Sequence, residues 1–169
     1  MEKVLLVQVV GWAVNIFLLA MGDGMVVGFK VKYYWYQIGR SDFLYSFFST
    51  VAYNLENGNW GSRFPVIMKK LYKGKLEREN VDKAIEELNI IEKELQNYKP
   101  DKVIWDIKDL SRQPPWGSSI CKDITNLRNY FVTSDGNDFL TVFFHALDKA
   151  KETNVELEIK CIYNGENHH

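Results

Sequence analysis

Hydrophobic positions in the first half of the chain follow a strand period and then a helix period. Residues 26–38 alternate loosely and are rich in valine and aromatic side chains, which predicts either one long strand or a hairpin of two strands. After Gly39, apolar residues recur at steps of three and four up to Asn57 and Gly58, which predicts a helix with Ser41 as its N-cap. The phenylalanine stripe of this helix indicates a core face rather than a cofactor pocket.

The next two periodic segments are helical. Residues 66–72 predict a short helix or turn that Gly74 ends. Residues 77–98 predict a long helix with a narrow apolar stripe, and Pro100 turns the chain so that this helix packs across the sheet. Residues 77–94 hold seven acidic and three basic side chains, a local charge of −4. A solvated face explains this excess, and an acidic partner-binding surface is the alternative.

The second half of the chain predicts three strands and one helix. Apolar residues in 102–107 indicate a central strand, and residues 130–132 indicate a short one. A turn at 133–136 leads into a helix at 137–153 that is apolar over most of its circumference and should be deeply covered. Residues 155–162 alternate strictly, as in a half-exposed edge strand. These elements predict an α+β fold: a single domain with a mixed or antiparallel sheet packed against three to four helices.

Residues 1–24 form a hydrophobic extension before this predicted domain. Residues 4–21 are mostly apolar and reach the lower length limit for a membrane span or a signal sequence. Because the flanking charges and cleavage site of both are missing, we favour an upstream extension before a true start at Met25. We therefore predict one domain at residues 25–163, a disordered tail at residues 164–169 and a cytoplasmic location. A membrane-anchored or exported protein is the alternative.

Charge and composition narrow the function classes. The chain has 21 basic and 22 acidic residues, so no global field attracts nucleic acid, and membrane contact stays open only through residues 4–21. Cys121 and Cys161 fit no metal-binding spacing and are predicted to be buried free thiols. With His168 and His169 at the terminus, His145 is the only internal imidazole. We predict neither a metal site nor a cofactor.

Two loops combine a tryptophan with an arginine. Residues 59–65 carry Trp60 and Arg63, and the second loop carries Asp109, Arg112 and Trp116. In the second loop, two successive prolines directly before the tryptophan stiffen the backbone. A rigid loop that presents an indole suits recognition, and an indole that covers the end of the core is an equally weighted alternative.

Catalytic motifs such as a phosphate loop, a nucleophile elbow or a zinc-protease signature are missing from the sequence. Asp106 and Asp109 follow the predicted central strand, and together with His145 they define an alternative function, a small hydrolase or nuclease. We favour a structural interpretation of each residue. Asp106 then caps the strand, Asp109 shapes a turn or pairs with Arg112, and His145 lies in the core or at its boundary.

Residues 25–162 resemble the immunity protein 70 family of bacterial polymorphic toxin systems. The resemblance is carried by five segments, YWYQIG at 34–39, FLYSFFSTVAYNLE at 43–56, GSRFPVIM at 61–68, VIWDIKDLSRQPPWG at 103–117 and NYFVTSDG at 129–136. It implies an α+β protein that is not an enzyme and that neutralises a toxin encoded beside it by binding the toxin's C-terminal domain.

A neutral domain without a catalytic constellation agrees with a one-to-one protein binder. Tryptophan and arginine dominate the binding energy of many interfaces. We therefore predict that the partner-binding face contains the residues of the two tryptophan loops, Trp60, Arg63, Asp109, Arg112 and Trp116.

Overall fold

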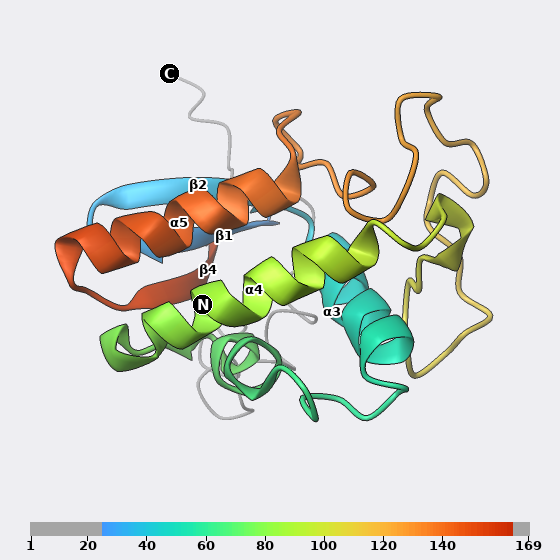
Figure 1. Cartoon of the computed structure of the whole chain (residues 1–169). Helices are drawn as coiled ribbons and strands as arrows, with labels where there is room; N and C mark the ends of the chain where they lie inside the picture. Colours follow the sequence, from blue (N-terminus) through green and yellow to red (C-terminus); the bar gives the residue numbers. More distant parts are fainter. Residues whose placement is uncertain (1–24, 164–169) are drawn as a thin grey trace, which may run out of the picture.

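The computed structural model describes residues 25–163. The predictions for residues 1–24 and 164–169 therefore lie outside the described residues. Within the described part of the chain, β1 (Met25–Val31), β2 (Tyr34–Gly39), β3 (Lys75–Leu76) and β4 (Leu157–Tyr163) form one antiparallel sheet in the order β2-β1-β4-β3. Helices cover one face of this sheet (Figure 1). The predicted single-domain α+β fold is confirmed, and its sheet is antiparallel.

The hairpin alternative for residues 26–38 is confirmed. Val31 pairs with Tyr34 across the two-residue turn Lys32-Tyr33, in which Lys32 takes a left-handed φ of 54°. Val27 and Phe29 of β1 are fully buried and point toward the helices. The hairpin therefore supplies both the start of the core and one edge of the sheet.

The predicted edge position of the last strand was wrong. β4 pairs with β1 on one side and with β3 on the other, so it lies inside the sheet. The alternation was read correctly, because Leu157 and Ile159 are buried while Glu158 and Lys160 are half-exposed. The error came from β3, a strand of only two residues that leaves no periodic pattern in the sequence.

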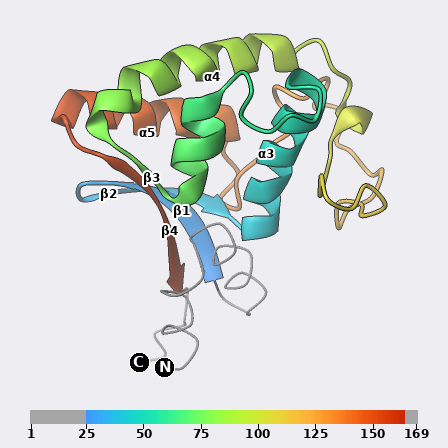
Figure 2. The same cartoon turned by 90° about the horizontal axis from the view of Figure 1, so that it is seen from below.

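Three long helices complete the fold, α3 (Ser41–Leu55), α4 (Val81–Leu95) and α5 (Phe139–Thr153). Between α3 and α4, the chain forms the short helices η1 (Val66–Lys70) and η2 (Leu71–Lys73), and left-handed Gly74 ends η2 as predicted. The 3-10 helix η3 (Arg78–Asn80) leads into α4. α5 contacts β1 and β2, whereas α4 packs against α5 and η1. Figure 2 shows α4 as the outermost layer, so the prediction that it packs across the sheet was wrong.

Phenylalanine rings form the centre of the core. The ring centroid of Phe29 lies 4.7 Å from that of Phe143. The ring of Phe47 lies 4.9 Å from Phe139 and 5.4 Å from Phe131, in edge-to-face geometry with both. The aromatic face of α3 is therefore core, as the periodicity predicted.

The start of α3 differs from the prediction by one residue. Arg40, with an extended backbone, is the N-cap, and Ser41 is the first helical residue. The Ser41 side chain is buried, and its hydroxyl has no hydrogen-bond partner among the described residues. Asp42 lies in the first turn, where its negative charge favours the helix dipole, and pairs with Arg40 at 2.6 Å.

The predicted central strand at 102–107 was wrong, because α3 side chains take the place of a neighbouring strand. The hydroxyl of Ser46 donates to the carbonyl of Ile104 at 2.8 Å, and the N–H of Ile104 donates to Thr50 Oγ1 at 3.0 Å. The N–H of Ile107 donates to Ser49 Oγ at 3.2 Å. The segment is thus held against a helix without entering the sheet, with Trp105 buried and its other apolar residues half-buried.

The predicted strand at 130–132 consists of a single bridge between Val132 and Asp138. The turn at 133–136 is confirmed, and Gly136 adopts the left-handed φ of 85° that this turn requires. Because the chain reverses immediately, the bridge has no room to extend into a ladder.

Three side chains are more accessible than the sequence indicated. His145 on α5 is exposed, and its neighbours Val142 and Phe144 are half-exposed, so α5 is not covered on all sides. Cys121 is exposed and Cys161 is half-buried, and both are free thiols. Helix periodicity identified the buried flank of α5 correctly, but the opposite flank borders an open cavity. Within the described part of the chain, every helix is too short or too polar to cross a membrane.

Candidate functional site

A segment without regular secondary structure, residues 103–138, joins η4 (Pro100–Lys102) to α5. Irregular segments of this length in a compact domain are commonly functional. Arg128 ties it to two helices, because its guanidinium pairs with Glu92 of α4 at 2.8 Å and with Asp138 at the start of α5 at 2.7 Å. The segment forms one side of the molecule beyond α3 and α4, coloured yellow to orange in Figure 1.

Trp116 lies at the surface of this segment and is held from two sides. Its ring meets buried Trp105 edge-on, with centroids 5.4 Å apart. Its indole N–H donates to the hydroxyl of Tyr130 at 2.8 Å, and burial raises the pKa of that hydroxyl. Trp116 is nevertheless 42% exposed. Both interpretations of this loop therefore apply to Trp116, because its ring packs against the core and part of the ring stays exposed.

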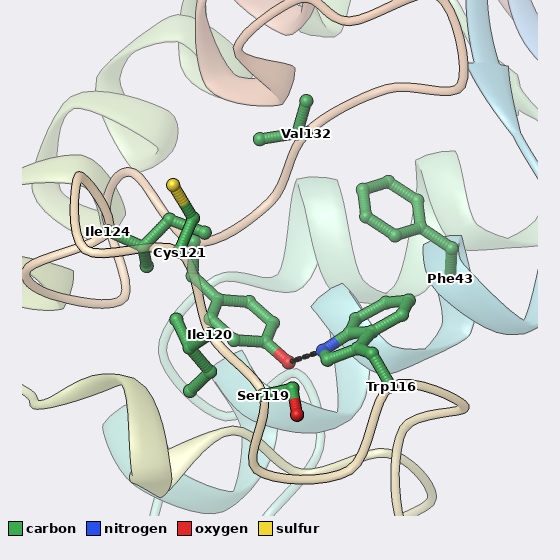
Figure 3. A pocket seen from close by; sticks show the side chains of 8 residues that line it. Phe43, Trp116, Ser119, Ile120, Cys121, Ile124 and Val132 are labelled. Atoms are coloured by element: carbon green, nitrogen blue, oxygen red, sulfur yellow. Dashed lines mark hydrogen bonds between the residues drawn. The ribbon is translucent and has the colours of Figure 1, made fainter.

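A half-open cavity of about 220 Å³ lies beside this ring. Its walls are formed by Phe43, Trp116, Ser119, Ile120, Cys121, Ile124, Tyr130 and Val132. Figure 3 shows the bond between the Trp116 indole and the Tyr130 hydroxyl inside this ring of side chains. This bond satisfies the indole N–H, and apolar side chains form most of the remaining wall. The volume lies below the roughly 300 to 1,000 Å³ of sites for drug-sized ligands and suits a single apolar side chain.

In the same loop as Trp116, Arg112 pairs with Asp106 at 3.3 Å rather than with Asp109. Asp106 also accepts a hydrogen bond from the N–H of Lys108, as a turn cap does. Asp109 accepts two bonds from Ser111, one from its hydroxyl and one from its N–H, and these bonds lower the pKa of Asp109. Both aspartates thus shape the turn that carries Arg112, whose side chain is 43% exposed.

Trp60 and Arg63 occupy a second place, where they stabilise their own loop. The Trp60 ring packs edge-on against Tyr72 with centroids 4.8 Å apart, and its N–H donates to the carbonyl of Met68. Arg63 pairs with Glu94 of α4 at 2.8 Å. These contacts give both residues a structural role, and their role in partner binding stays a prediction.

Tyr45 of α3 contacts both the loop that carries Trp60 and the turn that contains Asp106. Its ring stacks on Trp60 with centroids 6.2 Å apart, and its hydroxyl hydrogen-bonds Asp106. Burial, together with the neighbouring Asp106 carboxylate, raises the pKa of Tyr45 to about 12. This connection could not be predicted from the sequence, because Tyr45 lies within a helix whose phenylalanine side chains are core.

The acidic excess of α4 is largely used inside the molecule. Glu94 pairs with Arg63, Glu92 pairs with Arg128 of the irregular segment, and Asp82 pairs with Lys151 of α5 at 2.8 Å. Glu87 is buried and accepts the N–H groups of η1. This pairing disfavours an acidic partner-binding surface on α4.

Glu87 makes the stability of the fold depend on pH. Burial raises its pKa above the ordinary value of 4.5, while hydrogen bonds from Ile67 and Val66 offset part of the effect. The folded protein therefore binds this proton more tightly than the unfolded chain, and the contribution of Glu87 to stability falls as pH rises through the raised pKa. Relative to Glu87→Gln, we expect the unchanged protein to lose stability as pH rises over the range above about 4.5, measured by urea unfolding. A constant difference across this range would contradict the pKa shift.

The residues of the enzyme alternative do not line one cavity together. His145 lines a cavity of about 310 Å³ whose carboxylates are Asp135 and Asp138, and this cavity is lined by neither Asp106 nor Asp109. Among the described residues, no group of three or more His, Cys, Asp or Glu side chains could hold a metal ion. The arrangement gives no geometric support to the hydrolase or nuclease alternative.

Sequence reasoning missed most of the cavity wall. Phe43, Tyr130 and Val132 come from α3 and from the predicted short strand, and each was interpreted only as a structural residue. The resemblance segments 43–56, 103–117 and 129–136 contain Phe43, Trp116 and Tyr130, which meet at this cavity. The presence of these three residues in the resemblance segments was the sequence feature that could have indicated the cavity wall.

The fold and the cavity describe a small α+β protein with a pre-formed, mostly apolar cavity at its surface. The family model of immunity protein 70 matches residues 29–159, which is more than half of the chain, so the chain belongs to the immunity protein 70 family. The resemblance stated from the sequence is confirmed. No curated protein and no solved structure matches the chain. Membership of an immunity protein family suggests a role in neutralising a toxin.

Proposed function

We propose that this protein neutralises a cognate bacterial toxin by binding the toxin's C-terminal domain directly, as an inhibitor that is not an enzyme. The observation that supports the proposal is the apolar cavity beside half-exposed Trp116 in a member of an immunity protein family. A cavity that accepts one side chain, next to a half-exposed aromatic residue, is a usual environment of an interface hot spot, and the loop that holds this residue also carries an accessible arginine.

The rigidity of the site favours tight binding. Hydrogen bonds from α3 fix residues 104–107, the Trp105 ring supports Trp116, and Arg128 anchors the far end of the segment. A surface ordered before binding loses less conformational entropy when the partner docks. The irregular segment therefore acts as a pre-organised binding loop.

The experiment that tests the proposal mixes the purified chain with the C-terminal domain of the toxin encoded beside its gene. We expect a one-to-one complex by size-exclusion chromatography and calorimetry, and toxin activity that reaches zero at an equimolar ratio. No complex at micromolar concentrations would contradict the proposal. Loss of toxin activity at ratios far below equimolar would favour an enzyme instead, because only a catalyst acts on many toxin molecules.

A further inference from the structure

The free edge of β2 carries backbone groups that the sheet does not use. Because Val31 and Tyr34 close a two-residue turn, they exchange ladder hydrogen bonds, and so does the pair Phe29 and Tyr36 two positions further on. The N–H and C=O groups of the alternate residues, Trp35 and Gln37, therefore point away from β1. β2 is the outermost strand on this side of the sheet.

Only one end of this edge is covered by another described segment. The N–H of Ser134 donates to the carbonyl of Ile38 at 2.9 Å, and the side chain of Gln37 donates to Ser134 Oγ at 2.8 Å. Within residues 25–163, these are the hydrogen bonds found across the outer edge of β2. Among the described residues, no segment forms a backbone hydrogen bond with the outer edge of β2 from Tyr34 to Gln37.

A cavity of about 310 Å³ runs beside this open edge, between β2 and α5. We call it the β2–α5 groove; it is lined by Trp35, Tyr36, Gln37, Asp135, Asn137, Asp138, Thr141, Val142 and His145. Tyr36 and Val142 supply apolar surface. Within the described part of the chain, the side chains of Asn137 and His145 have no hydrogen-bond partner, so both are available to a ligand.

The sequence of β2 does not protect its edge. Natural edge strands are commonly blocked by lysine, proline or an inward-pointing charge. Residues 34–39, YWYQIG, contain none of these. An open strand edge beside a helix binds an extended peptide through the main chain, while alternate side chains of the peptide enter the groove.

The charges at the two ends of the groove select the partner segment. At the Tyr34 end, Lys32 is exposed in the turn, whereas Lys149, which lies over the Tyr34 ring at 4.7 Å, is already paired with Glu152. At the other end, Asp135 is exposed, whereas Asp138 is already paired with Arg128. Charge complementarity favours a segment with an acidic residue at the Tyr34 end and a basic residue at the Asp135 end.

We propose that the β2–α5 groove binds an extended segment of the toxin as an added strand paired with β2. The inference rests on the proposed function, since the partner is the toxin. It is continuous with the Trp116 cavity, because Val132 lines that cavity, Asp138 lines the groove, and the two residues form a bridge. One toxin domain thus contacts both.

Backbone hydrogen exchange on the full chain, alone and with the toxin domain, tests this pairing. The amides of Trp35 and Gln37 exchange quickly in the free chain and at least about tenfold more slowly in the complex, whereas the amide of Tyr36 is slow in both. Equal exchange of Trp35 and Gln37 in both states overturns the inference while leaving the proposed function intact. Absence of any complex overturns both.

A matched pair of substitutions at Gln37 isolates the backbone donor. Gln37→Pro removes the outward N–H, and Gln37→Ala removes the side chain but keeps the N–H. We expect the proline variant to bind the toxin domain about tenfold more weakly than the alanine variant. Equal affinities overturn the inference. If the proline variant does not fold, the exchange measurement decides. If these amides exchange more slowly in the free chain as its concentration rises, the edge binds a second copy of the chain. This result also overturns the inference.

Discussion

Replacing Trp116 and Arg112 together by alanine is expected to weaken binding of the cognate toxin domain by more than about 2 kcal/mol, roughly thirtyfold in Kd. Trp116 forms one wall of the cavity and is 42% exposed, so its loss removes both the aromatic surface and the shape of the pocket. Arg112, in the same loop, adds an accessible guanidinium that is held by Asp106. Calorimetric titration measures the change, and circular dichroism verifies the fold.

A matched control comes from the same loop. Leu110 is 53% exposed and Lys108 is exposed, and neither lines the cavity. The variant Leu110→Ala with Lys108→Ala should keep the affinity of the unchanged protein within about 0.5 kcal/mol. Unchanged affinity of the Trp116 and Arg112 variant would remove both residues from the binding site.

Glu56→Ala is expected to lower the free energy of unfolding by about 3 kcal/mol. The Glu56 carboxylate is buried at the end of α3, where it accepts the N–H groups of Gly61, Arg63 and Phe64 at 2.9 to 3.2 Å. Alanine leaves these donors without their acceptor, and an unsatisfied buried donor costs about 1–3 kcal/mol. Since this carboxylate organises the loop that carries Trp60, the environment of that indole should change as well.

Urea unfolding followed by tryptophan fluorescence measures the loss. Glu86→Ala on the exposed face of α4 is the control, because its pair with Lys83 is solvent-exposed and should change stability by less than about 0.5 kcal/mol. If Glu56→Ala and Glu86→Ala unfold at the same urea concentration, Glu56 does not hold the loop as described.

The longer elements with a regular hydrophobic period were predictable from the sequence. The hairpin at 26–38 and the helices α3, α4 and α5 follow from alternation and from steps of three and four residues, because each buries one face. The tryptophan loops were recognisable as well, since proline, glycine and exposed charge mark them. The candidate site was predictable only in part, because Trp116 and Arg112 were named while the cavity wall was not.

Local pattern failed where partners come from distant parts of the chain. Residues 103–107 have the composition of a strand, yet their backbone bonds go to hydroxyl groups of Ser46, Ser49 and Thr50 on α3. These three side chains recur at steps of three and one along the helix, which gives a buried polar stripe. A sequence shows such a stripe but not which backbone it will meet.

By itself, the sequence determined the family, the α+β class, the strand character of residues 26–38, the three long helices and the loop that holds Trp116. Tertiary structure alone decided that β4 lies inside the sheet, that Arg112 pairs with Asp106, and that the 130–138 segment borders both the Trp116 cavity and the β2–α5 groove. The physical reason is the distance along the chain over which each kind of pattern acts. Periodicity records which face of an element is buried, whereas a cavity or a strand edge exists only between elements that the fold brings together.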